Sequence, residues 1–360
     1  MIEISVNLGA RSYPILVAAG ALSLVGAELT KRGVGRKVVL VSDPAIARLH
    51  AESLVRSLGQ AGFDVAQVAV PAGEQAKRLE VASDLWDRLL DAGCDRTSTV
   101  VALGGGAVGD VAGFAAATYM RGMNFVQVPT TLLAQVDASS GGKTAINHPR
   151  GKNLIGAFHQ PRMVIVDPSA LTTLSEREFR SGLAEVIKHG IVLDAAYFRD
   201  LEACVPALLA RDLATLENIV AGSCRLKARV VERDEQEAEL RWVLNYGHTV
   251  GHALEAATGF QRWAHGEAVS LGMVAEARLA ERLGIGSAST TERQRNLLGA
   301  VGLPVKGLAV DPGAVMEALS RDKKRRDGRV SFVLAPTIGS FQIVQDVSPD
   351  AVRQVLQELV

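Results

Sequence analysis

One stretch decides the fold, Thr99-Val-Val-Ala-Leu-Gly-Gly-Gly-Ala-Val-Gly-Asp110. A short β-rich run is followed at once by a glycine-rich turn, in which Gly104, Gly106 and Gly109 have the spacing G-x-G-x-x-G. Directly after a strand, such a turn lets the backbone approach a pyrophosphate at the N-terminus of the next helix. The stretch therefore predicts a βα unit that binds a dinucleotide. A glycine-rich turn that only closes a βα unit is the alternative.

Short β-rich runs recur on both sides of this turn. They are separated by longer amphipathic or glycine-rich segments and lie at Lys37–Val41, Val65–Val70, Phe125–Val128 and Met163–Val166. Strands that alternate with helices predict a parallel sheet covered by helices. From Ser175 the pattern changes, because the capping box Ser175-Glu-Arg-Glu178 opens long Ala/Leu/Glu-rich segments with one late strand, Val330–Leu334. We therefore expect an α/β domain over residues 1–173 and a mainly helical domain over residues 174–360.

The acidic residue that normally follows this fingerprint by about twenty residues and binds the ribose is missing. Asp43, at the end of the earlier strand Lys37–Val41, is placed to accept hydrogen bonds from ribose hydroxyls instead. An acidic residue there disfavours a 2′-phosphate, so NAD is favoured over NADP.

Hydroxyls, glycines and two lysines gather between Val128 and Asn153, in Val128-Pro-Thr-Thr131, Asp137-Ala-Ser-Ser-Gly-Gly-Lys143-Thr and Gly151-Lys152-Asn153. Such residues are typical of an anion site. A solvated Gly/Ser loop is the alternative. It explains each lysine singly, but less easily the pair flanked by glycines.

Composition limits the classes of partner. The 360 residues hold 39 basic and 39 acidic side chains, with one dense basic cluster at residues 321–326, so nucleic acid is not the expected partner. Three cysteines without zinc spacing argue against a disulfide framework. No apolar run approaches membrane-spanning length, and the N-terminus alternates as a strand does and has no signal-peptide pattern. We expect a cytoplasmic enzyme.

A second constellation has the residues of a metal site. His248 and His252 are four residues apart in a segment expected to be helical, Trp242–Ala257, so both imidazoles lie on one face. His265 follows, and Glu185 lies in the first helix of the helical domain. Three protein ligands leave one position open for substrate, as catalytic zinc requires. Spacing alone favours His248, His252 and His265; His189, four residues after Glu185, could also compete, although an ordinary Glu–His helix pair explains it.

These motifs, taken together, resemble the 3-dehydroquinate synthase family. The resemblance spans nearly the whole chain and is carried by residues 104–110, Thr118-Tyr-Met-Arg-Gly122, Val128-Pro-Thr-Thr131, Gly141-Gly-Lys143-Thr, Gly151-Lys152-Asn153, Leu183-Ala-Glu185-Val-Ile-Lys188, Asn245-Tyr-Gly-His248-Thr-Val-Gly-His252 and His265-Gly-Glu267. It implies a Rossmann-like NAD-binding α/β domain, a mainly helical C-terminal domain that binds zinc or cobalt, and a homodimer.

The resemblance also implies roles for individual residues. The metal ligands become Glu185, His248 and His265, and His252 turns toward substrate. The implied NAD contacts are Asp43, Gly73, Glu74, Lys77, Gly105, Gly106, Ala107, Val108, Gly109, Asp110, Thr130, Thr131, Asp137, Lys143, Lys152, Thr172 and Thr173. The implied catalytic and substrate-binding residues are Lys143, Lys152, Asn153, Lys188, Lys227, Arg241, Asn245, His252, Arg121 from the partner subunit, and one of Lys323 and Lys324.

The reaction implied converts 3-deoxy-D-arabino-heptulosonate 7-phosphate, a heptulosonate phosphate, into 3-dehydroquinate and phosphate. It proceeds by transient oxidation with NAD, β-elimination of phosphate, reduction and intramolecular aldol closure, in the shikimate pathway to aromatic amino acids. Three alternatives remain open: another sugar phosphate cyclase, a metal-dependent polyol dehydrogenase, and a nucleotide-binding regulatory module.

Overall fold

The computed structural model describes residues 1–321, 330–345 and 347–360. The chain forms two compact units. Unit 1 comprises Met1–Leu174 with Leu216–Gln236, and unit 2 comprises Ser175–Thr215 with Glu237–Val360. This division differs from the single expected boundary after residue 173, because residues 216–236 group with unit 1.

Unit 1 is built on a seven-stranded sheet. Its strands, in spatial order, are β1 (Ile2–Val6), β2 (Tyr13–Val17), β9 (Met163–Val166), β6 (Asn124–Pro129), β5 (Thr99–Gly104), β3 (Lys37–Ser42) and β4 (Asp64–Ala69). All neighbours pair in parallel except β1 and β2, which form an antiparallel edge. The five predicted strands are therefore confirmed, as is the parallel sheet.

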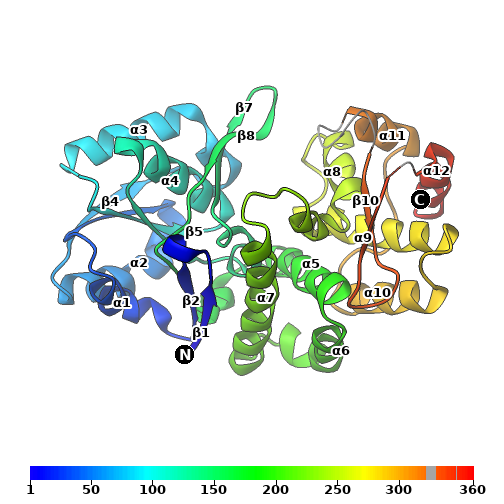
Figure 1. Cartoon of the computed structure of the whole chain (residues 1–360), viewed down its shortest axis with the longest axis horizontal. Helices are drawn as coiled ribbons and strands as arrows, with labels where there is room; N and C mark the ends of the chain where they lie inside the picture. The colour runs from blue at the N-terminus through cyan, green and yellow to red at the C-terminus, as the bar shows by residue number, and fades with distance from the viewer. Residues whose placement is uncertain (322–329, 346) are drawn as a thin grey trace. The chain divides into compact units, whose positions relative to one another are not determined.

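Both faces of this sheet are covered, which explains the continuous apolar runs of its strands β3, β5 and β9. Side chains alternate across a strand. On β3, Val38 and Leu40 pack with α1 (Val25–Lys31) and α2 (Pro44–Gln60). The intervening residues Val39 and Val41 pack with α3 (Leu79–Asp91) and α4 (Gly106–Thr118). Figure 1 shows the strands of unit 1 between these two helix layers.

Two further parts of unit 1 carry expected site residues. One is the antiparallel hairpin of β7 (Lys143–His148) and β8 (Gly151–Phe158), which the sequence did not predict. The other is α7 (Leu213–Arg233), of which residues from 216 onward belong to unit 1. Short turns complete the unit: η1 (Gly9–Arg11), η2 (Ala21–Leu24), η3 (Gly73–Lys77), η4 (Tyr119–Arg121), the π-helical η5 (Ala134–Ala138) and η6 (Pro168–Thr173).

Hydrogen bonds fix residues 216–236 to unit 1. Asn7 N donates to Glu232 Oε1 at 2.7 Å, and Arg11 pairs with Glu235 at 2.6 Å. Further along the helix, Cys224 Sγ donates to the carbonyl of Gln135. These partners are distant in sequence, so a helical pattern alone does not reveal which unit α7 joins.

Unit 2 is mainly helical, as expected. Its helices are α5 (Glu176–Leu193), α6 (Ala195–Leu209), η7 (Leu240–Asn245), α8 (His248–Ala257), α9 (His265–Arg282), α10 (Ala288–Ala300), α11 (Pro312–Arg321) and α12 (Pro349–Glu358). The predicted cap of α5 is present, since Ser175 Oγ accepts from Glu178 N at 3.3 Å. The late strand is confirmed as β10 (Phe332–Leu334). It pairs with β11 (Gln342–Val344), which the sequence did not predict.

The predicted start of the histidine helix is wrong. Leu240–Asn245 forms a 3-10 helix, and α8 begins only at His248. Gly247 separates the two with φ of 78°, a left-handed conformation that favours glycine. Among the helices of the described residues, none is both long and apolar enough to cross a membrane.

Close approach of α8 and α9 gives a stability prediction. A Cβ at Gly272 of α9 would overlap the carbonyl oxygen of Gly247 and lie 2.9 Å from the nitrogen of Gly251. Backbone cannot move aside cheaply, so Gly272→Ala should lower the free energy of unfolding by about 1–3 kcal/mol or more. Denaturant titration followed by circular dichroism measures this change.

Gly299→Ala is the matched control. Gly299 lies in α10, where the nearest atom to an added Cβ is 4.0 Å away. Alanine is favoured there by up to about 1 kcal/mol in a helix. Equal stabilities for the two variants would contradict the packing described for α8 and α9.

Candidate active site

Two of the expected nucleotide-binding features, Asp43 and the glycine turn, lie at a reversal in the strand order of unit 1. From β3 the chain crosses to β4 on one side, whereas β5 lies on the other side of β3 and leads to β6. Open α/β sheets bind ligands outside the carboxyl ends of strands at such a reversal. Asp43 ends β3 and the glycine turn ends β5, so both flank this point. Asp43 Oδ1 accepts from Ala45 N and Ile46 N, and thereby caps α2.

The glycine turn fits a pyrophosphate. Gly105 is the N-cap of α4, and Gly106, Ala107, Val108, Gly109 and Asp110 form its first turns. The first amides of a helix have no partner within it and attract anions. A Cβ at Gly105 would approach Thr131 Cγ2 to 3.2 Å, and one at Gly106 would approach Ala138 Cβ to 3.2 Å. Beside them, Thr130 Oγ1 is buried without a hydrogen-bond partner among the described residues. The glycines thus leave space for a pyrophosphate, and the hydroxyl of Thr130 beside that space is able to form a hydrogen bond with it.

Lys77, expected at the cofactor, is held in a polar network. It is 3% exposed, pairs with Asp110 at 2.5 Å and donates to Asn153 Oδ1. Burial raises the pKa of Asp110, and the ammonium of Lys77 opposes that rise. Asn153 has φ of 54°, and its nitrogen donates to Asn147 Oδ1 at 3.0 Å.

Asn147 was missed by sequence reasoning. Its Nδ2 donates to Glu74 Oε2 at 2.7 Å, so it joins the η3 turn to the β7–β8 hairpin. Asn147 lies four residues after Lys143, in a segment for which no strand was predicted. A strand assignment there would have paired it with the region of Asn153.

The remaining unit 1 candidates are placed as follows. Lys143 and Lys152 are exposed on β7 and β8, and Arg121 is exposed at the end of η4. Gly73 opens η3 with φ of 62°, and the hydroxyls of Thr172 and Thr173 in η6 donate to the carbonyls of Ser169 and Ala170. Lys227 of α7 is buried, and its ammonium binds both the carboxylate and the carbonyl of Asp137 in the η5 turn. The structure therefore brings Lys227 to Asp137 within unit 1.

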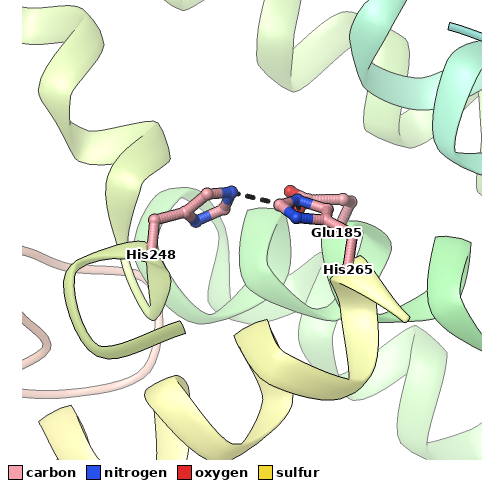
Figure 2. Close-up of side chains that lie close together, drawn as sticks. All are labelled: Glu185, His248 and His265. Carbon is pink, nitrogen blue, oxygen red and sulfur yellow. Dashed lines mark ion pairs between the residues drawn. The ribbon is translucent and has the colours of Figure 1, made fainter. Parts of the chain in front are cut away.

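In unit 2, three side chains converge as metal ligands would. Glu185 of α5, His248 of α8 and His265 of α9 each offer an atom within 4.8 Å of the others. His248 Nε2 and His265 Nε2 both lie 3.3 Å from Glu185 Oε1. Figure 2 shows the imidazole of His248 pointing toward Glu185 and His265.

These separations fit a tetrahedral ion. Ligand atoms bound at about 2.0–2.2 Å in tetrahedral geometry lie about 3.3–3.5 Å apart. His248 Nδ1 lies 3.1 Å from the carbonyl oxygen of Tyr246. Because a carbonyl can only accept, Nδ1 carries the hydrogen and Nε2 presents its lone pair. A carboxylate oxygen and an imidazole lone pair that face one another call for a cation between them.

The charge around the centre suits a bound metal at Glu185 and His248. At His265, burial alone would lower the pKa, but Glu185 and Glu255 raise it to about 10, so a metal would displace a proton there. The ammonium of Lys188 binds Glu185 Oε2, which turns Oε1 toward the imidazoles. Burial alone would raise the pKa of Glu185, but Lys188 and His248 outweigh it and hold that pKa well below its usual value. Burial lowers the pKa of His248. Both groups therefore favour the deprotonated forms that bind metal.

Neighbouring contacts hold the helix ends that carry these ligands. Glu276 Oε2 accepts from Gly247 N at 2.6 Å, just before His248. Glu267 Oε2 accepts from Ala264 N at 2.8 Å and caps α9 at His265. Arg177 of α5 binds Glu267 through two hydrogen bonds, at 2.9 and 2.7 Å. Glu276 and Arg177 were not found from the sequence, because they act through the folded backbone.

The ligand set chosen by spacing alone is not supported. Among the described residues, His248, His252 and His265 do not form a metal group, because His252 groups with Glu255 and His265 instead. His189 is buried in α5 and belongs to neither group. Arg241 is buried in η7, and Asn245 ends that helix. Lys323 and Lys324 lie outside the described residues.

Metal content tests the ligand assignment. Glu185→Ala and His248→Ala remove one of three converging ligands, so the purified variants should lose bound metal and activity. His252→Ala should retain metal and lose turnover, since His252 lies outside the group. Elemental analysis of the three proteins decides the matter, and a metal-free His252→Ala beside a metal-loaded Glu185→Ala would refute the assignment.

Comparisons with known proteins identify the family of this chain. Two family models match consecutive parts of the chain, "3-dehydroquinate synthase N-terminal" over residues 67–181 and "3-dehydroquinate synthase C-terminal" over residues 182–325. The 3-dehydroquinate synthase of Desulforamulus reducens is 49% identical over 358 residues, which cover 99% of each chain.

Solved structures of related cyclases have the same fold. A 2-deoxy-scyllo-inosose synthase, complexed with carbaglucose-6-phosphate, NAD⁺ and Co²⁺, is 25% identical with a TM-score of 0.89 over 100% of both chains. The 2-epi-5-epi-valiolone synthase of Streptomyces hygroscopicus subsp. jinggangensis, with NAD⁺ and Zn²⁺ bound, is 28% identical with a TM-score of 0.89 over 98% of both chains. With both family models matched and nearly half of all residues shared with a full-length relative, the chain belongs to the 3-dehydroquinate synthase family.

Proposed function

We propose that this protein is a cytoplasmic 3-dehydroquinate synthase, a lyase that converts 3-deoxy-D-arabino-heptulosonate 7-phosphate into 3-dehydroquinate and phosphate. The observation that carries the proposal is the converging group of Glu185, His248 and His265, in a chain whose other unit has a nucleotide cradle. Its relatives with this name are about half identical to it over nearly their full length.

The cofactors proposed are NAD and one divalent metal, zinc or cobalt. When bound, NAD would accept and return a hydride, and the metal would act as a Lewis acid on a substrate oxygen. Asp43 would bind the ribose at the end of β3, and the amides that open α4 would bind the pyrophosphate. Because hydride returns to the substrate, NAD is not consumed.

The substrate carries a carboxylate and a phosphate, and cations are proposed for each. Lys143, Lys152 and Arg121 suit the phosphate, and Arg241 with Lys227 suits the carboxylate. Within unit 1, the ammonium of Lys227 also binds the carboxylate of Asp137.

Further proposed contacts concern the reacting hydroxyls and protons. Lys188, Asn245 and His252 are proposed to bind the substrate near the metal group, and one of Lys323 and Lys324 to face the substrate. None of the proposed substrate-binding residues is a carboxylate base. We propose that the phosphate of the substrate takes the proton as it leaves.

Phosphate release with catalytic NAD tests the function. The purified protein, with added metal and NAD well below the substrate concentration, should release one phosphate per substrate without accumulating NADH. Stoichiometric NADH would favour a polyol dehydrogenase. Absence of turnover despite bound nucleotide and metal would favour a regulatory module, and either result would refute the proposal.

Substrate identity gives the next prediction. Arg241→Gln should raise KM for the heptulosonate phosphate by roughly 10²-fold, because a buried charge-assisted contact is worth about 3 kcal/mol. kcat should fall as well, since a poorly held substrate is misaligned. Steady-state kinetics measure both constants, and Arg295→Gln, an exposed arginine of α10, is the control for loss of charge.

A seven-carbon sugar phosphate without the carboxylate completes that experiment. Wild type should discriminate strongly against it, and Arg241→Gln should not. If wild type uses the neutral sugar as well as the acid, and Arg241→Gln treats the two alike, another cyclase replaces the proposed function.

We also propose a homodimer in which Arg121 serves the partner's site. Met120 and Arg121 have φ of 49° and 65°, a strained backbone for residues other than glycine, and strain of this kind gathers at functional positions. On the nearby hairpin, Leu154, Ile155 and Phe158 of β8 are 46%, 39% and 47% exposed. We propose that a second copy of the chain covers these exposed apolar side chains.

Subunit mixing tests the role of Arg121. Arg121→Ala and Glu185→Ala should each be inactive alone. Mixed dimers should regain activity, because one of their two sites contains both intact residues. After subunit exchange has been verified by mass, an absence of recovered activity would place Arg121 in its own subunit's site.

A further inference from the structure

The imidazole of His265 lies between two carboxylates. Its Nε2 is 3.3 Å from Glu185 Oε1, and its Nδ1 is 3.4 Å from Glu255 Oε1. Glu255 is only 9% exposed, so its carboxylate is largely shielded from water. Glu255 is not one of the three proposed metal ligands, but it faces Nδ1 of His265, which is one of them.

Glu255 comes from the same helix as His248. His248, His252 and Glu255 occupy positions i, i+4 and i+7 of α8, which places them along one face. The first turn of α8 thus supplies a metal ligand, and its last turn supplies a carboxylate. The turn after Glu255 is fixed, because Phe260 N donates to the carbonyl of Glu255 at 2.8 Å.

The hydrogen on His265 follows from this arrangement. With a metal bound on the Nε2 side, the hydrogen of the neutral imidazole lies on Nδ1, where the ionised carboxylate of Glu255 can accept it. His248 reaches the same tautomer differently, because its Nδ1 faces the neutral carbonyl of Tyr246. The two imidazoles therefore differ in charge environment.

We propose that Glu255 is the positioning residue of the metal centre, which accepts a hydrogen bond from Nδ1 of His265 and thereby orients Nε2 and makes it a stronger donor to the metal. Carboxylate–histidine–metal arrangements of this kind tune metal affinity in many sites. The proposal rests on the metal centre of the proposed function. The distance of 3.4 Å between His265 Nδ1 and Glu255 Oε1 is longer than the usual hydrogen-bond distance of about 2.9–3.0 Å. The experiment therefore has to measure how strongly this hydrogen bond affects metal binding.

A second cation is the rival occupant. His252, Glu255 and His265 also offer ligand atoms within 4.8 Å of one another. To bind there, His265 would have to lose its Nδ1 hydrogen and bridge two metals as an imidazolate. A hydrogen bond needs no such deprotonation, so the geometry favours one metal and one positioning carboxylate.

The test measures metal binding directly. Glu255→Gln keeps an acceptor and loses the charge, whereas Glu255→Ala loses both. Glu281→Gln, an exposed glutamate on α9, controls for net charge. Each protein is stripped with a chelator, loaded with Co²⁺, and followed by its visible d–d absorption and by Co²⁺ release to a competing chelator.

We expect Glu255→Ala to bind Co²⁺ about 10–100-fold more weakly than wild type, with Glu255→Gln in between. The d–d bands of both metal-saturated variants should shift, because the donor strength of His265 changes. Glu281→Gln should match wild type. A merely structural role would change the thermal unfolding of the metal-free proteins but not the spectrum of saturated Glu255→Gln, and that pattern would overturn the proposal.

Two other outcomes would also overturn it. Unchanged affinity and spectrum in both Glu255 variants would show that Glu255 does not act through His265. Two Co²⁺ ions per wild-type chain, falling to one in Glu255→Ala, would identify a second cation site. If Glu255→Ala fails to fold, Glu255→Gln alone decides. Because the readout is metal binding, a wild type that binds one Co²⁺ without releasing phosphate would refute the proposed function and leave this inference standing.

Discussion

The converging ligand atoms of Glu185, His248 and His265 are the constraint on which unit 2 depends. A carboxylate oxygen and two imidazole nitrogens within 4.8 Å of one another form a group that suits a single cation. To bring them together, three helices must meet closely, and Gly272 makes the closest approach of α9 to α8 possible. The packing of these helices therefore positions the metal ligands. A change at the α8–α9 contact should alter metal binding.

Unit 1 would bind an anion, the pyrophosphate, with the backbone amides that open α4 instead of with side chains. The reversal of strand order beside β5 leaves the N-terminus of α4 uncovered, and Gly105 and Gly106 keep side chains out of the way. Lys77 and Asp110 neutralise each other beneath this turn. Residues 216–236 add Lys227 to the same unit, although they follow two helices of unit 2 in sequence.

The features that could be predicted from the sequence are those that local patterns of residues determine. The strands β3, β5 and β9 were found because burial on both faces gives unbroken apolar runs, and the cap at Ser175 has a local signature. The start of α8 was wrong because Gly247 adopts a left-handed conformation that periodicity cannot reveal. The spacing of the histidines favoured His252 as a ligand, because spacing along the chain cannot show that Glu185 approaches from α5. Contacts such as Asn147 with Glu74 depend on tertiary pairing and have no local signal.

The most direct test of the metal centre is anomalous scattering at the cobalt absorption edge from crystals grown with Co²⁺. The account predicts a single strong peak about 2.0–2.2 Å from Nε2 of His248, Nε2 of His265 and an oxygen of Glu185. A peak bound instead by His252 and Glu255, with Glu185 turned away from it, would contradict the account.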